Sequence, residues 1–170
     1  MELGESFVGE GAEAAHVNTV LGRRDGPVGT AWATALATPR AGHAAFVTVL
    51  QPGLPVQPAT LFINKATIAG DAHARMTWGP AQAGVAAGVA DAVAAGTLRA
   101  AEAPDLVLIA AVWVDPAATD AERVFRNNRQ ATAAALLAGR TGHPAVDDVT
   151  RQRDRAWNPF FRPSDGEPDA

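Results

Sequence analysis

The chain has 170 residues, of which 48% are hydrophobic and 19% charged, with a formal net charge of −4. This length and composition suffice for one globular domain with a buried core, while the acidic balance argues against nucleic-acid partners. The sequence contains no cysteine, which excludes disulfides, thiolate metal sites and cysteine nucleophiles. It shows no signal peptide and no apolar run near the roughly 20 residues that span a bilayer. We therefore expect a cytoplasmic protein that does not bind membranes.

The first two expected strands carry a candidate histidine. Glu2–Val8 is predicted as an edge strand, and residues 15–21 alternate so that His16 and Asn18 leave the same face. Between these strands, residues 9–14 match the letters of a dinucleotide-binding G-x-G-x-x-A loop. We reject that interpretation because its two glutamates would face the pyrophosphate and a strand follows where a helix is needed. The glycines instead predict a turn.

The central segment 60–96 is predicted as a strand followed by a helix. Lys65 and Thr67 stand two residues apart, so both side chains are expected on one face of the strand. A short polar connection, GDAHAR, then leads to a helix with Pro80 in its first turn. Gln82 would lie in the same turn. The segment therefore predicts a pocket wall formed by Lys65, Thr67 and Gln82.

Hydrophobic periodicity and turn residues indicate further elements, namely a helix over 27–36, a strand over 44–50, a doubly buried strand over 106–114 and a long helix over 116–138 that stops at Gly139. Together these elements predict helices packed on a mixed sheet. Three further histidines, His43, His73 and His143, share no face with a second metal ligand. We interpret them as surface or loop residues, and the sequence indicates a site without metal or nucleotide.

The C-terminal segment 140–163 is basic and aromatic. Basic residues interleaved with aromatic ones can bind single-stranded nucleic acid, but the acidic chain and the short run argue against it. We expect Trp157, Phe160 and Phe161 to dock onto the domain or a neighbouring subunit, because exposed apolar bulk is unfavourable in water. Residues 164–170 are expected to form a disordered tail.

Two motifs of the central segment resemble the formaldehyde-activating enzyme family. These are the N-K-x-T-I strand in FINKATI and the G-P-A-Q-x-G-V-A helix start in WGPAQAGVAAG, and the resemblance covers roughly residues 2 to 161. It implies a carbon–oxygen hydro-lyase of one-carbon metabolism and formaldehyde detoxification. Such an enzyme condenses formaldehyde with its cosubstrate tetrahydromethanopterin, giving the methylene derivative and water without a metal.

The same resemblance implies roles for individual residues. His16 falls on the family's catalytic histidine, and its unperturbed pKa of about 6.5 suits a general acid and base. The implied substrate contacts are Asn18, Val47, Lys65, Thr67 and Gln82. Lys65 is also open to interpretation as a Schiff-base lysine.

Two of these positions depart from the family pattern. Asn18 stands where the family has aspartate, and Val47 where it has leucine. The departures leave two alternatives open. One is a paralogue that condenses formaldehyde or another aldehyde with a different amine or pterin, and the other is a non-catalytic aldehyde- or pterin-binding protein.

The resemblance also implies the fold and the assembly. The expected fold is α/β (α+β), a two-layer sandwich resembling the second domain of ribosomal protein S5, with helices packed on a mixed sheet. One such domain would cover residues 1–163. The family assembly is a ring of five subunits with sites between them, so we expect a homo-oligomer, most simply a pentamer.

Overall fold

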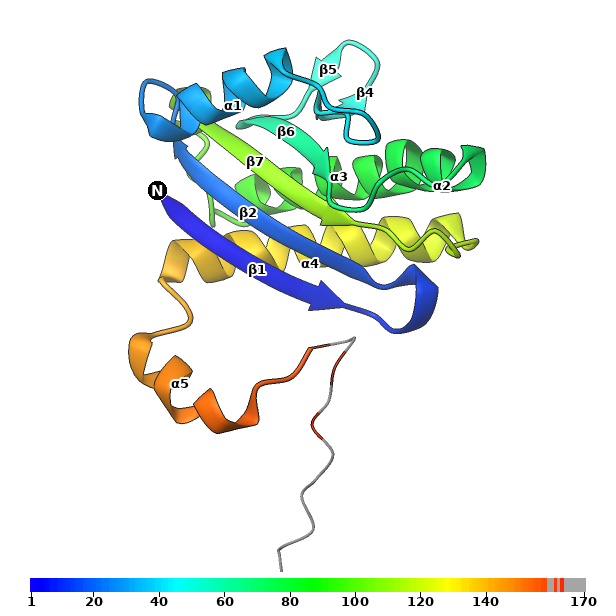
Figure 1. The fold of residues 1–170 in the computed structure, drawn as a ribbon. Helices are drawn as coiled ribbons and strands as arrows, with labels where there is room; N and C mark the ends of the chain where they lie inside the picture. The colour runs from blue at the N-terminus through cyan, green and yellow to red at the C-terminus, as the bar shows by residue number, and fades with distance from the viewer. Residues whose placement is uncertain (159–160, 162, 164–170) are drawn as a thin grey trace, which may run out of the picture.

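The computed structural model describes residues 1–158, 161 and 163 of the chain. Its centre is a five-stranded mixed sheet in the order β1-β2-β7-β6-β3 (Figure 1). The strands are β1 (Glu2–Val8), β2 (Ala15–Arg23), β3 (Phe46–Val47), β6 (Ala59–Asn64) and β7 (Leu106–Trp113). β6 runs parallel to β7, and the other neighbours are antiparallel. A separate small hairpin joins β4 (Val49–Gln51) to β5 (Leu54–Pro55).

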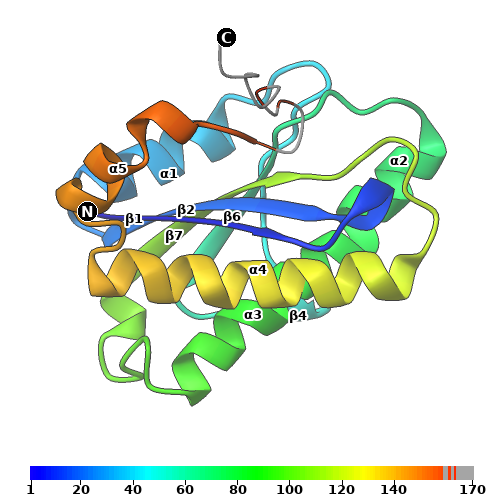
Figure 2. The ribbon, with the colours of Figure 1, turned by 90° about the horizontal axis from the view of Figure 1, so that it is seen from below.

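Helices cover the two faces of this sheet unequally. The helices are α1 (Pro27–Ala37), α2 (Asp71–Met76), α3 (Gln82–Ala94), α4 (Ala121–Thr141) and α5 (Val146–Arg151). Helices α3 and α4 form a layer on one face, while α1 lies on the opposite face against β2 and β7 (Figure 2). The expected mixed sheet with helices packed on it is confirmed. Beyond α1 this other face is partly open at β1, where Leu3 and Glu5 are exposed.

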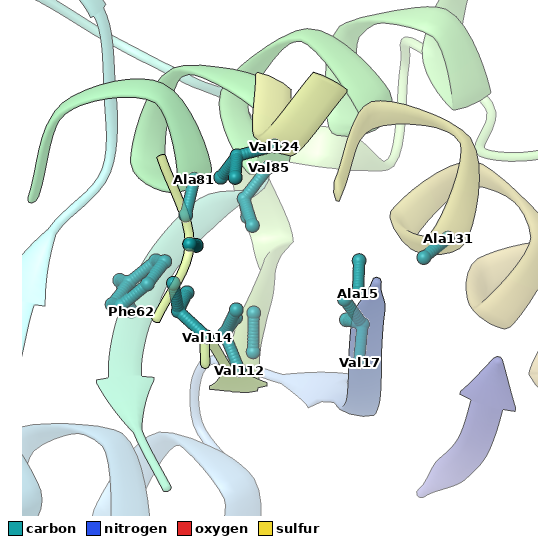
Figure 3. Packing of buried hydrophobic residues seen from close by; sticks show 11 residues of the cluster. Ala15, Val17, Phe62, Ala81, Val85, Val112, Val114, Val124 and Ala131 are labelled. Atoms are coloured by element: carbon teal, nitrogen blue, oxygen red, sulfur yellow. The ribbon is translucent and has the colours of Figure 1, made fainter. Parts of the chain in front are cut away.

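The core lies between the sheet and the α3–α4 layer. Every second residue of β2 is buried there, as a strand with one covered face requires. Val17, Phe62, Val85 and Val112 meet in this core (Figure 3).

The helices α3 and α4 pack closely because glycine occupies two contact positions of α3. A Cβ added at Gly84 would lie 2.5 Å from the carbonyl oxygen of Phe125, and one at Gly88 would lie equally close to that of Arg129. Only a residue without a side chain fits such a backbone contact. Glycine at these two positions therefore permits the close packing of α3 on α4.

The prediction for the central segment is partly wrong. Its strand ends at Asn64, so Lys65 and Thr67 both lie beyond the strand and not on one of its faces. The expected polar connection GDAHAR is helical and forms α2, and a π-helical turn, Thr77–Ala81, carries the chain from α2 into α3. Pro80 therefore lies inside a helical path. A π turn tolerates this residue because the regular hydrogen-bond ladder is already interrupted there.

Two other boundaries differ from expectation. The strand expected over 44–50 is divided between β3 and β4. The long helix begins after Asp120 rather than at Pro116. The Asp120 Oδ1 accepts a hydrogen bond from the Arg123 N–H at 3.0 Å, which satisfies a backbone donor in the first turn of the helix. Gly139 lies within the helix and abuts the backbone of β1, and the helix ends at Gly142, whose φ of 68° suits glycine.

The turn between β1 and β2 contains a 3-10 segment, Gly11–Glu13, that leads directly into a strand, so its interpretation as a turn is confirmed. In the C-terminal segment, Trp157 is 62% exposed and Phe161 is 59% exposed. Phe160 and the expected tail 164–170 lie outside the described residues. Within the described part of the chain, no helix has the length and apolarity to cross a membrane.

Candidate active site

The sheet face opposite α3 and α4 gathers the polar residues of the first two strands. Strand pairing places Phe7 opposite His16 and Glu5 opposite Asn18, and His16 pairs on its other side with Trp113 of β7. Paired residues of antiparallel strands leave the same face of a sheet. The predicted placement of His16 and Asn18 on one face is therefore confirmed, and Glu5, Phe7 and Trp113 join them.

His16 is held by β1. Its Nε2 lies 2.9 Å from the Glu5 Oε1, a diagonal contact across the hairpin, and its ring lies 5.9 Å from the Phe7 ring, centroid to centroid. Burial lowers the pKa of His16 first, and the charge of Lys65 lowers it further, whereas the Glu5 carboxylate opposes both. The imidazole is thus less readily protonated than a free one, although Glu5 favours its charged form.

Lys65 approaches the same group of residues from the end of β6. Its backbone N–H donates to the Val112 carbonyl at 2.8 Å, which continues the pairing of β6 with β7. Its Nζ is enclosed and has no hydrogen-bond partner among the described residues. Burial lowers the pKa of Lys65 to about 8, and the Glu5 carboxylate opposes this shift. A substantial fraction of the amine is therefore neutral near physiological pH.

Asn64 fixes the backbone on both sides of Lys65. Its buried side-chain amide donates to the carbonyl oxygens of Gly42, at 2.8 Å, and Ala66, at 2.7 Å. The Asn64 carbonyl in turn lies 2.9 Å from the Nδ1 of His43, which must carry a proton to make that bond. The other ring nitrogen of His43 then accepts from the Thr67 hydroxyl at 3.2 Å. Thr67 and Lys65 are thus held in one ordered turn.

Gln82 and Val47 lie away from His16 within one chain. Gln82 is buried at the start of α3, on the other face of the sheet, and its Nε2 donates to the Val49 carbonyl at 2.8 Å. Val47 is in β3, three strands from β2. The predicted wall of Lys65, Thr67 and Gln82 is therefore not formed in a single chain, because the helical path through α2 carries Gln82 across to the opposite face.

A groove of about 530 Å³ runs between α1 and the sheet and adjoins the turn that holds Lys65. Ala31, Thr34, His43 and Ile63 are among its lining residues, and Ile63 lies in β6 two positions before Lys65. An apolar groove with a few polar groups at its rim suits a planar organic ligand.

Sequence reasoning missed one member of the site and misread one histidine. Glu5 was not singled out, although alternation in the first strand places it on the face of Phe7, and a short hairpin would bring that face to His16. The prediction of a surface or loop position for His73 is wrong, because this residue is buried. Its Nδ1 accepts from the Ala69 N–H, so Nε2 carries the proton and donates to the Val114 carbonyl, each at 3.0 Å. No sequence signal identifies this structural role.

The site has the groups needed for proton transfer beside an amine, on a sheet that carries no nucleotide loop. In the described ranges, no cluster of three or more His, Asp or Glu side chains could hold a metal ion. A histidine paired with a carboxylate, next to a partly deprotonated lysine, defines a candidate acid–base site for small carbonyl or amine substrates.

Comparison with known proteins identifies the family. The model for the formaldehyde-activating enzyme matches residues 3–161, and the chain belongs to this family, as the resemblance of its central motifs implied. The chain is 39% identical over 158 residues to 5,6,7,8-tetrahydromethanopterin hydro-lyase of Methanosarcina barkeri, which covers 93% of this chain and 89% of that protein.

Bifunctional relatives are similar as well. The chain is 43% identical over 156 residues to the bifunctional enzyme Fae/Hps of Methanococcoides burtonii, and 38% identical over 160 residues to that of Methanosphaera stadtmanae. These alignments cover 92% and 94% of this chain but 39% of each bifunctional protein. The chain thus spans well under half the length of these relatives.

Proposed function

We propose that the protein is a hydro-lyase that condenses formaldehyde with tetrahydromethanopterin and releases water. Membership of the formaldehyde-activating enzyme family and the name of the Methanosarcina barkeri relative support this substrate pair. The observation that carries the proposal is the His16–Glu5 pair beside Lys65 on the open sheet face. This pair supplies a positioned proton donor where a small carbonyl compound and an amine can meet.

The condensation requires a group that donates one proton and later accepts one. An amine of the pterin adds to formaldehyde, and the resulting carbinolamine must expel its hydroxyl group. The protonated His16 donates to this hydroxyl, the C–O bond breaks, and water leaves. A second amine closes the methylene bridge, and its proton returns to His16. Because Glu5 holds a proton on Nε2, Nδ1 is the nitrogen that exchanges protons with the substrate.

The remaining residues are proposed as substrate contacts. Asn18 offers an amide oxygen and an amide donor on the open face, and Lys65 a donor with little competition from other partners. Thr67 adds a hydroxyl at the same turn, and Val47 supplies apolar packing at the sheet edge. Gln82 completes the proposed set.

We further propose that the complete site is shared between subunits of a homo-oligomer, as the pentameric family assembly implies. The separation of Gln82 and Val47 from His16 supports this, because one ligand contacting all three needs residues of two chains. Mixing inactive His16→Ala and Gln82→Ala chains tests it. In assemblies that mix the two variants equally, about a quarter of the shared interfaces combine an intact His16 from one chain with an intact Gln82 from the other. About a quarter of the wild-type activity should therefore return. No recovery in mixed oligomers would contradict a shared site.

A second candidate is the same condensation with a different amine or pterin. Asn18 favours it, because the family's aspartate would accept charge-assisted hydrogen bonds that the neutral amide cannot match. His16 and Lys65 argue against a non-catalytic binding protein, since binding alone needs neither a general acid nor a partly neutral amine.

The test of the function is a rate comparison. Purified protein should accelerate condensation of formaldehyde with tetrahydromethanopterin above the spontaneous rate. Acceleration seen only with another reduced pterin or amine would replace the first candidate by the second. Binding of tetrahydromethanopterin without acceleration of any condensation would refute both.

The setting of this activity is part of the proposal. We propose one domain over residues 1–163, acting in the cytoplasm and without a metal. The absence of cysteine is compatible with a reducing compartment, and the histidine mechanism accounts for dehydration by proton transfer alone.

A further inference from the structure

Lys65 is the only lysine of the sequence, although lysine and arginine together number 14. Surface ion pairs, such as Arg129 with Asp91 and Arg140 with Glu2, therefore use arginine. A guanidinium remains protonated and cannot act as a nucleophile, whereas a lysine amine can lose its proton. The one side chain able to supply a primary amine lies on the candidate site face, beside His16 and Glu5.

The surroundings of the Lys65 amine differ from those expected for a lysine that serves only as a positive charge. Its Nζ is enclosed and has no hydrogen-bond partner among the described residues, and the nearby carboxylate, Glu5, lies 2.9 Å from His16. A lysine that served only as a charge would be expected to pair with a carboxylate. Here the amine is held by its backbone turn, and no described residue takes up its nitrogen in a hydrogen bond.

We propose that Lys65 captures formaldehyde covalently and then passes its carbon to the reduced pterin. This inference rests on the proposed function for the acceptor. It goes beyond that function because it makes Lys65 a catalytic nucleophile, whereas family resemblance implies only a substrate contact.

The charged groups that face Lys65 support this role. Burial lowers the pKa of Lys65 to about 8, and the Glu5 carboxylate opposes the shift. Among the described residues, His16 is the other titratable group that interacts with Lys65. At pH 7.5 the neutral fraction is then about a quarter, which is roughly 200-fold more than for a lysine with an unperturbed pKa. The site thus presents a nucleophile and a proton donor side by side.

The capture step balances with the groups at the site. The neutral Lys65 amine attacks the carbonyl carbon, a C–N bond forms, and a proton moves from nitrogen to oxygen to give a carbinolamine. His16 in its protonated form donates to the hydroxyl, the C–O bond breaks, and water leaves an iminium ion on Lys65.

Transfer to the pterin returns the enzyme to its starting state. The first pterin amine attacks the iminium carbon, and its proton passes to the Lys65 nitrogen. The bond between that nitrogen and the carbon then breaks, which leaves a neutral lysine and a pterin iminium ion. The second pterin amine closes the bridge, and its proton returns to His16. The sum is formaldehyde and two amines converted to a methylene bridge and water.

Rapid mixing followed by a borohydride quench tests the capture step on the intact protein. Borohydride reduces an iminium ion to a stable methylamine, so isotope-labelled formaldehyde should leave one methyl group on Lys65, located by peptide mass spectrometry. We expect this label to appear within the time of one turnover. We also expect it to disappear when tetrahydromethanopterin is added before the quench, as product forms.

Two variants make the trapping specific. Arg24→Lys places a second lysine on the exposed surface, and this matched amine should gain little label in the same interval. In His16→Ala the Lys65 label should form more slowly by about 10²-fold, because the proton donor for dehydration is lost. An equal rate of labelling at both lysines of Arg24→Lys would overturn the proposal.

A third variant separates a nucleophile from a charge. Lys65→Arg keeps the cation and should reduce the condensation rate to the spontaneous one, with circular dichroism and oligomer mass used to verify folding. Retention of most activity by this variant would show that only the charge is needed and would overturn the proposal.

The outcomes also distinguish this inference from the function on which it rests. Absence of Lys65 label in a wild-type protein that accelerates the condensation overturns covalent capture and leaves the function intact. Label on Lys65 in a protein that does not accelerate the tetrahydromethanopterin reaction supports capture and refutes that acceptor.

Discussion

Replacing Glu5 by glutamine should shift the pH dependence of the reaction to lower pH. The Glu5 carboxylate lies 2.9 Å from the His16 Nε2 and raises the pKa of both His16 and Lys65. Glutamine keeps the size of the side chain and removes its charge. Both pKa values should therefore fall in Glu5→Gln, and both limbs of a rate profile governed by these groups should move in the same direction.

The size of the shift follows from exposure of the pair. The Glu5 and His16 side chains are 60% and 32% exposed, so the pair resembles a surface ion pair, which contributes about 0.2–1 kcal/mol. Loss of this interaction should lower the pKa of His16, and about 1.36 kcal/mol corresponds to a tenfold change in the proton-binding equilibrium. The protonated fraction of His16 at pH 8 should therefore decrease by about 1.4- to 5-fold. The larger neutral fraction of Lys65 at the same pH offsets part of this loss in the rate.

The assay combines a titration with rates. Nuclear magnetic resonance of the His16 ring protons gives its pKa directly, and condensation rates from pH 5.5 to 8 give the profile. Glu122→Gln is a matched control, because this glutamate lies exposed on α4 and its loss should leave the pKa of His16 unchanged. A pKa of His16 that rises or stays constant in Glu5→Gln would refute the reasoning.

Three other changes have defined outcomes. Asn18→Asp restores a charged acceptor on the open face and should improve affinity for tetrahydromethanopterin by about tenfold, the difference between a neutral and a charge-assisted hydrogen bond; equal Michaelis constants across pH 5.5 to 8 would contradict it. Gly4→Ala directs a methyl group into the α4 backbone and should lower the free energy of unfolding by about 1–3 kcal/mol or more. A Cβ added at Gly79 would meet nothing within 4 Å, so Gly79→Ala should not lower the free energy of unfolding in this way. Equal denaturation midpoints for the two variants would refute the packing argument. His73→Leu leaves a buried donor and acceptor unpaired, at about 1–3 kcal/mol each; an unchanged unfolding midpoint would show that these bonds contribute nothing.

Local patterns in the sequence predicted those features of the site that depend on a single strand. Alternation alone placed His16 and Asn18 on the same face, because side chains of any strand alternate. The role of Glu5 could not be read in the same way. It depends on the register of the hairpin between β1 and β2, which the turn at residues 9–14 sets, and on a diagonal contact across that register.

In the central segment, by contrast, a local sequence signal gave a wrong prediction for the position of Gln82. Pro80 is a strong signal for the first turn of a helix, and it placed Gln82 near the end of the preceding strand. In the structure a π turn includes Pro80 and joins α3 to α2, so the helical path starts earlier and Gln82 faces β4. Tertiary contacts with other parts of the chain override the preference of Pro80 for the first turn of a helix. The sequence of one segment does not show these contacts.

The most direct test of the account is the condensation rate of His16→Ala compared with wild type, at equal formaldehyde and tetrahydromethanopterin concentrations near pH 7. The account predicts that wild type exceeds the spontaneous rate and that the folded variant loses about 10²–10⁴-fold of its catalysis, the contribution of a general acid. A folded His16→Ala protein with the wild-type rate would contradict the assignment of catalysis to this sheet face.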